Sequence, residues 1–131
     1  MIGPDTNILV RYLTQDDPIQ SLRATEIIER RLTEKNRGFV SIVAMVGTVW
    51  VLERAYRLPA GEIASAIERM LQIDVLVVQN EQEVFSAMIA LKEGQGSFAD
   101  AVIAALGTRA GCSRTLTIDQ KVLRLPGFEF P

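Results

Sequence analysis

Apolar positions along the chain follow two alternating patterns. Segments in which apolar residues recur every three or four positions predict helices, and short continuous apolar runs predict strands. The predicted helices cover residues 5–17, 18–35, 41–57, 59–71, 81–93 and 98–111, and the predicted strands cover 1–4, 38–42, 73–78 and 114–119. The second helix is expected to turn five apolar side chains inward: Ile19, Leu22, Ile27, Ile28 and Leu32.

Strands that alternate with helices favour an α/β fold. With 131 residues, 48% of them hydrophobic, the chain can bury one core, so we expect a single domain over residues 1–131. Right-handed crossovers would place the strands in one mostly parallel central β-sheet flanked by α-helices. In such sheets ligands bind beyond the carboxyl ends of the strands, which is where functional side chains are expected.

Composition narrows the functional classes. The chain has one cysteine, Cys112, and no histidine, so an internal disulfide and a zinc site of Cys and His are excluded. A net charge of −2 provides no general attraction to nucleic acid. No apolar run is long enough to span a membrane, and the first residues do not resemble a signal peptide. We therefore expect a cytoplasmic protein that does not bind membranes.

Three aspartates lie beside apolar residues at the expected ends of elements. Asp5 follows the first strand, Asp119 follows the last strand, and Asp100 lies in the first turn of the helix that begins after Ser97. Each has an ordinary interpretation, as a helix cap or as an acid favoured by the helix dipole. If the first and last strands are neighbours in the sheet, however, the carboxylates of Asp5 and Asp119 converge.

A cluster of carboxylates is tolerated when a cation neutralises it. Oxygen ligands without histidine or thiolate favour Mg²⁺ or Mn²⁺. Such a site can bind a phosphodiester and activate water without a protein nucleophile. Thr6 and Asn7, which follow Asp5, can support the site through short polar side chains, although ordinary helix capping explains them equally well.

The segments "DTNILVRYLTQDDP", "VWVLERAY", "SFADAVIAALGTRAGC" and "RTLTID" together resemble the PIN-domain ribonucleases, specifically the VapC-type toxins of toxin–antitoxin pairs. The resemblance covers essentially the whole chain. It implies a parallel sheet flanked by helices and an endoribonuclease that depends on Mg²⁺ or Mn²⁺. It also implies a homodimer and inhibition by a partner antitoxin of the VapB kind.

The resemblance assigns the acidic site residue by residue. Asp5 matches the first acidic position of the family, Asp100 the third and Asp119 the fourth, while Ser97 stands where many relatives have serine or an additional aspartate. The second position, a glutamate three residues before the tryptophan of "VWVLERAY", is Gly47 in this chain. Glycine inside a helix costs about 1 kcal/mol relative to alanine. Gly47 is thus a vacant acidic position.

Several alternatives remain open at this stage. Gly47 is either an inactivating change acquired under selection against a toxic nuclease or a natural feature of a catalytically impaired domain that binds antitoxin or RNA. A phosphatase with Asp5 as nucleophile is disfavoured by Asn7, because that chemistry normally uses a second acid two residues on.

The remaining expectations concern partners. The apolar stretches 43–56 and 63–71 suggest a symmetric dimer, and Trp50 and Tyr56 are expected in the core or at that interface rather than stacked on bases. Basic residues that could line an RNA path are Arg11, Arg30, Arg31, Lys35 and Arg37. Arg54 and Arg57 could contact the antitoxin. A basic antitoxin side chain that reaches Asp5 and Asp100 would complement their charge.

Overall fold

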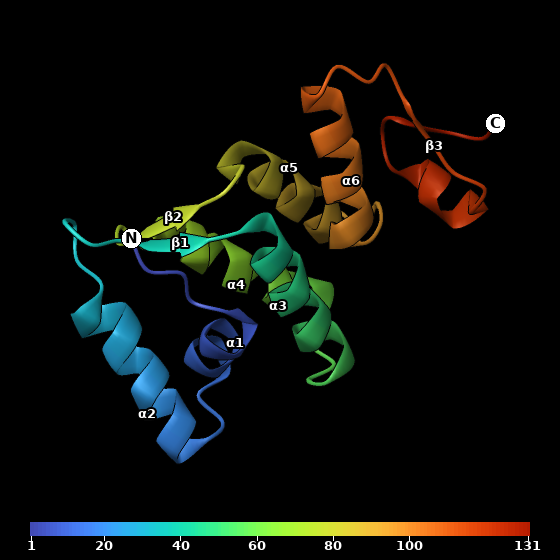
Figure 1. Ribbon diagram of the computed structural model, residues 1–131. Coiled ribbons are helices and arrows are strands. Elements are labelled where there is room, and N and C mark those ends of the chain that lie inside the picture. Colours follow the sequence, from blue (N-terminus) through green and yellow to red (C-terminus); the bar gives the residue numbers. More distant parts are fainter.

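The computed structural model describes all 131 residues. Helices make up most of the fold, with a few very short strands (Figure 1). In chain order the elements are α1 (Thr6–Thr14), α2 (Pro18–Glu26), the π-helix η1 (Ile27–Arg31), β1 (Gly38–Val40), α3 (Ile42–Arg54), α4 (Ala60–Gln72), β2 (Leu76–Val78), α5 (Glu81–Lys92), α6 (Phe98–Arg109), β3 (Thr115–Leu116), the 3₁₀-helix η2 (Gln120–Arg124) and β4 (Phe128–Glu129). No helix is both long and apolar enough to cross a membrane.

Helix starts follow from local side-chain chemistry. Asp5, Asp17, Ser41 and Ser97 each accept a hydrogen bond from a backbone N–H of the first helical turn, which satisfies a donor that has no partner inside the helix. The predicted helix over 18–35 is shorter, because α2 gives way to a π-turn that ends at Arg31. The helices and short parallel strands are consistent with the expected α/β class, but the strands are shorter than predicted: residues 1–4 form one isolated bridge, and only Thr115–Leu116 of the 114–119 segment is a strand.

The expected single sheet is not formed. β1 pairs in parallel with β2, with Gly38 opposite Leu76 and Val40 opposite Val78, and the first residues contribute only one parallel bridge, between Ile2 and Gly38. β3 pairs instead with β4 in a separate two-stranded parallel sheet. The prediction that the 114–119 strand joins the same sheet as residues 1–4 is wrong for this structure.

One hydrophobic core joins most helices. Ile63, Ile67 and Met70 of α4 are buried in the same core cluster as Met45 and Leu52 of α3. Most apolar residues of the 63–71 stretch are thus buried in the core. Their contribution to an exposed dimer face is correspondingly small.

The inward face of α2 differs from the prediction. Ser21 and Ala24 are its buried residues, whereas Ile19 is 71% exposed and Leu22 is 60% exposed. Small side chains let α2 approach α1 closely, and this geometry turns the two larger residues outward. Ile28 and Leu32, farther along the chain, are buried as predicted.

Residues 115–131 form a small C-terminal unit beside α6, on the far side from β1 (Figure 1). Within it, the N–H of Thr115 donates to the carbonyl of Gly127 at 2.7 Å, and the N–H of Thr117 donates to that of Glu129 at 3.1 Å. Leu125 is 3% exposed and packs where a Cβ at Gly96 would lie only 2.6 Å from its side chain. Gly96 therefore makes room for Leu125, the buried residue of this unit.

Candidate functional site

Asp5 lies at the point where the first extended segment enters α1. Its Oδ1 accepts the N–H of Ile8 at 3.1 Å, so the carboxylate caps the helix while the residue itself stays exposed. A shallow pocket of about 370 Å³ adjoins it, lined by Gly3, Pro4, Asp5, Thr6, Phe39, Ser41, Val43 and Ala44. Asp5 thus combines a capping role with access to solvent. Asn7 is also exposed.

Gly47, in the middle of α3, faces the start of α1. A Cβ built at Gly47 would lie 3.0 Å from Oγ1 of Thr6 and 3.9 Å from its Cγ2. Thr6 is the residue directly after Asp5, so a side chain at position 47 would extend beside the Asp5 region. Because 3.0 Å is tighter than an ordinary contact, Thr6 would have to shift slightly to accommodate it.

Asp100 is held by the N-terminus of α6. The Oγ of Ser97 donates to Oδ2 of Asp100 at 2.9 Å and accepts the N–H of Asp100 at 3.1 Å. This reciprocal pair uses one carboxylate oxygen only, and the side chain is half-buried. Ser97 thus fixes the orientation of Asp100 as well as capping the helix.

Asp119 belongs to the C-terminal unit. Its Oδ1 accepts the N–H of Lys121 at 3.0 Å, and its own N–H donates to Oγ1 of Thr117 at 3.0 Å. These contacts begin η2 and leave the residue exposed. The ordinary capping interpretation therefore applies to Asp119 as it does to Asp5.

The three aspartates do not come together within one chain. No group of three or more acidic or cysteine side chains lies close enough to hold a metal ion. The expected convergence depended on residues 114–119 running beside residues 1–4, and β3 pairs with β4 instead. A single chain in this arrangement therefore does not present a complete donor set for a divalent cation.

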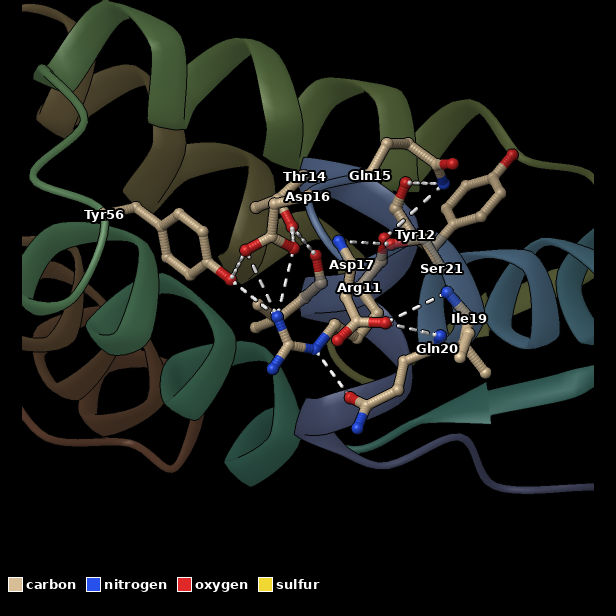
Figure 2. Close-up of polar contacts among 11 residues, drawn as sticks. Arg11, Tyr12, Thr14, Gln15, Asp16, Asp17, Ile19, Gln20, Ser21 and Tyr56 are labelled. Carbon is tan, nitrogen blue, oxygen red and sulfur yellow. Dashed lines mark hydrogen bonds and ion pairs between the residues drawn. The ribbon is translucent and has the colours of Figure 1, made fainter.

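A different carboxylate is fully partnered, in a cluster that the sequence did not reveal (Figure 2). Asp16 accepts hydrogen bonds from the hydroxyl of Tyr56 at 2.7 Å, from that of Thr14 at 2.8 Å, and from Nη1 of Arg11 at 3.0 Å. The Tyr56 hydrogen bond is the largest of the causes that lower the pKa of Asp16 to about 2. The hydrogen bond from Arg11 to Asp16 raises the pKa of Arg11 above its usual value.

This Asp16 cluster is structural in character. It links the end of α1 to Tyr56, just beyond the end of α3, and Arg11 also donates to Oε1 of Gln20 on α2 at 2.9 Å. The larger pocket next to it, about 750 Å³, is lined by Leu13, Thr14, Asp16, Leu52, Tyr56, Leu58, Pro59, Gly61, Glu62, Ser65, Ala66 and Arg69. None of the three candidate aspartates lines this pocket.

Trp50, the tryptophan of the "VWVLERAY" segment, is 56% exposed. The guanidinium carbon of Arg54 lies over it, 5.5 Å from the centroid of the Trp50 ring. Of the two locations expected for it, the core is therefore excluded. The exposed residue Val43 is on the same helix. Basic side chains gather elsewhere, where Arg23, Arg30 and Arg31 line an open pocket of about 720 Å³ at the end of α2.

The chain was compared with known proteins and with models of protein families. The comparison with curated proteins finds no match. The family model described as "PIN domain" matches residues 2–127, which is nearly the whole chain and includes Asp5, Gly47, Asp100 and Asp119. The chain therefore belongs to the PIN domain family.

Proposed function

We propose that the protein is an endoribonuclease that hydrolyses RNA phosphodiester bonds and serves as the VapC-type toxin of a toxin–antitoxin pair. PIN domains are generally nuclease-like, typically bind RNA, and usually use Mg²⁺ or Mn²⁺. The observation that supports the proposal is the approach of Gly47 to Thr6, the residue directly after Asp5. Asp5, Asp100 and Asp119 are the proposed catalytic acids.

The candidate acids have no ion-pair partner within the chain, and this supports a cationic ligand. Neither Asp5 nor Asp100 forms an ion pair with a lysine or arginine of the chain, whereas Asp16 does. The two acids are thus free to meet a cation from outside, either a metal ion or a basic side chain of a VapB-type antitoxin. A bound antitoxin would then inhibit the nuclease by occupying the acids that cleavage needs.

The residues of one chain do not fit Mg²⁺ or Mn²⁺ as they stand, because no three acids gather and Gly47 supplies none. What the chain itself offers is an exposed carboxylate at Asp5 and an oriented one at Asp100. An oriented carboxylate can accept a proton from water that attacks phosphorus. The second candidate function, an impaired PIN domain that binds antitoxin or RNA without efficient cleavage, is favoured specifically by Gly47.

Restoring the acid separates these two functions. Cleavage of one RNA is measured for the present sequence and for Gly47→Glu, Gly47→Gln and Gly47→Ala, each with Mg²⁺ or Mn²⁺ and with chelator. Loss of a residue that supports a metal ligand typically costs about 10–100-fold in activity, so Gly47→Glu should gain at least that factor. Gly47→Gln matches the shape without the charge, and Gly47→Ala adds only the Cβ that meets Thr6.

The outcomes differ clearly. A gain confined to Gly47→Glu and abolished by chelator supports the nuclease. Equal activity in all four proteins means that Gly47 is not the vacant acidic position. Activity that survives in Gly47→Glu combined with Asp5→Ala belongs to a contaminating nuclease. RNA binding without cleavage in every variant favours the impaired PIN domain.

A further inference from the structure

One face of α3 carries an exposed tryptophan beside the vacant acidic position. Four residues recur there at intervals of three or four positions, which aligns them along one side of the helix: Val43, Gly47, Trp50 and Arg54. Because a Cβ at Gly47 would meet Thr6, this face passes close to the start of α1, against which α3 packs (Figure 1). Trp50 lies three positions after Gly47, about 4.5 Å farther along the helix axis.

The Trp50 ring is paired with a cation instead of with the core. Trp50 is 56% exposed, and Val43 on the same face is 77% exposed. The guanidinium carbon of Arg54 lies 5.5 Å from the ring centroid, which is a cation–π distance. Arg54 forms no ion pair with an acid of the chain. Its charge is therefore available to an anion from outside.

An exposed aromatic ring and an unpaired arginine suit a nucleotide whose base is not in a duplex. Every base has a flat face that can stack on an indole ring, and a phosphate can pair with a guanidinium. In a duplex the neighbouring bases cover these faces, so an aromatic ring can stack only on bases of a single strand. Arg57, which is exposed and also without an ion pair, adds positive charge just beyond the end of α3.

A second copy of the chain matches this surface less well. It would cover Arg54 together with Trp50, and burying a charge that has no partner is costly. An RNA strand brings a phosphate with every base and so supplies the missing partner. The exposure of Trp50 and the unpaired charge of Arg54 are thus reasons to prefer stacking over the core or interface position expected from the sequence.

We propose that Trp50 stacks on an unpaired base of the RNA and that Arg54 binds a neighbouring phosphate, so that the strand crosses this face of α3 toward Asp5. The inference rests on the proposed function for the identity of the ligand, and it narrows that ligand to single-stranded RNA. Trp50 is then a specificity-determining residue, because it selects which segment of a folded RNA reaches the acids.

The fluorescence of the protein tests stacking directly. The chain has one tryptophan, so the signal reports on Trp50 alone. The protein is titrated in chelator, which prevents metal-dependent cleavage, with a short unstructured RNA, with a duplex of the same sequence, and with an abasic strand that keeps every phosphate. The unstructured RNA should quench the fluorescence, whereas the duplex and the abasic strand should leave it nearly unchanged. Equal quenching by the abasic strand overturns the proposal.

Substitutions separate the ring from the charge, with affinity measured by the anisotropy of labelled RNA. Trp50→Leu should weaken binding of the unstructured RNA by about tenfold and leave binding of the abasic strand unchanged. Arg54→Gln should weaken both. Phe85→Leu is the matched control, because Phe85 is 51% exposed on α5, and it should change neither affinity. Equal losses in Trp50→Leu and Phe85→Leu contradict a role for this face.

Two further measurements distinguish the alternatives. If Trp50→Leu turns a dimer into a monomer by light scattering while RNA affinity is kept, Trp50 belongs to an interface between copies and the proposal is wrong. In the Gly47→Glu background, Trp50→Leu should raise KM for single-stranded RNA more than it lowers kcat. RNA bound without quenching overturns stacking alone. Quenching without cleavage in any variant supports stacking and refutes the nuclease alone, and failure of every variant to bind RNA overturns both.

Discussion

The molecule uses its aspartates in two contrasting ways. In the Asp16 cluster, one carboxylate receives hydrogen bonds from a tyrosine, a threonine and an arginine of its own chain. At the candidate site, the carboxylates of Asp5, Asp100 and Asp119 accept hydrogen bonds only from a backbone N–H group or from one serine hydroxyl. The carboxylate of Asp16 is neutralised within the chain, whereas the other three carboxylates have no ion-pair partner in it.

The two regions therefore differ in what a substitution should change. Removing the charge of Asp16 weakens a contact between segments that are distant in sequence, since Tyr56 lies 40 positions away. Removing charge at Asp5 leaves the local cap intact if the new residue can also cap. Stability and activity should thus respond to opposite sets of variants.

The largest effect is expected from Asp5→Asn in the Gly47→Glu background. Asparagine caps helices as well as aspartate does, so the urea midpoint should stay within error. Loss of the carboxylate should lower RNA cleavage by about 100-fold, at the upper end of the range for residues around a metal. Asp16→Asn in the same background is the control and should keep cleavage near the parental rate. If instead Asp16→Asn abolishes cleavage, the division of roles is wrong.

A smaller effect is expected from Tyr56→Phe, which removes the hydroxyl that donates to Asp16 at 2.7 Å. Because Asp16 is solvent-exposed, this hydrogen bond contributes only a small part of the stability. Urea unfolding should report a correspondingly small loss, with RNA binding unchanged. Unaltered stability would show that the cluster is incidental to the fold.

The smallest effect is expected on the stability of the protein at low pH. Hydrogen bonding, chiefly from Tyr56, holds the pKa of Asp16 at about 2, below its usual 3.8. The stabilisation by Asp16 is therefore fully present above about pH 4 and disappears as the pH falls toward 2. Thermal unfolding between pH 5 and pH 2 should lose less stability in Asp16→Asn than in the parent. Parallel curves for the two proteins would place the acid dependence elsewhere.

Local chemistry explains why most of the helices were predictable. The Ser97 cap lies at the helix start that the sequence indicates, with α6 beginning directly after it, and α3 begins directly after Ser41, where its helix is predicted to start. The π-turn after α2 was not predictable, because Ile27–Arg31 has the same apolar spacing as a continuing α-helix. The exposure of Ile19 and Leu22 depends on which side of α2 meets α1, and that is a property of tertiary packing.

Long-range pairing explains the remaining failures. Only Thr115 and Leu116 of the segment "RTLTID" form a strand, and nothing within the segment specifies whether residues 1–4 or residues 128–129 will be its neighbour. The Asp16 cluster unites a turn after α1 with Tyr56, and only the folded chain brings them together. For the candidate site, the sequence identified Gly47 as exceptional, while its approach to Thr6 emerged only from the fold.

The single buried anchor of the C-terminal unit has a consequence for local unfolding. Leu125 is the only buried residue after residue 110, and burying one leucine contributes about 1.5–3 kcal/mol. Val122 and Phe128 add only partly buried contacts to the same core, so residues 115–131 should open at a lower free energy than the helical body. Their amide protons will exchange with solvent long before those of α4, and the exposed Lys121 and Arg124 will be the first bonds open to trypsin. The tail of the chain is thus a separately melting element.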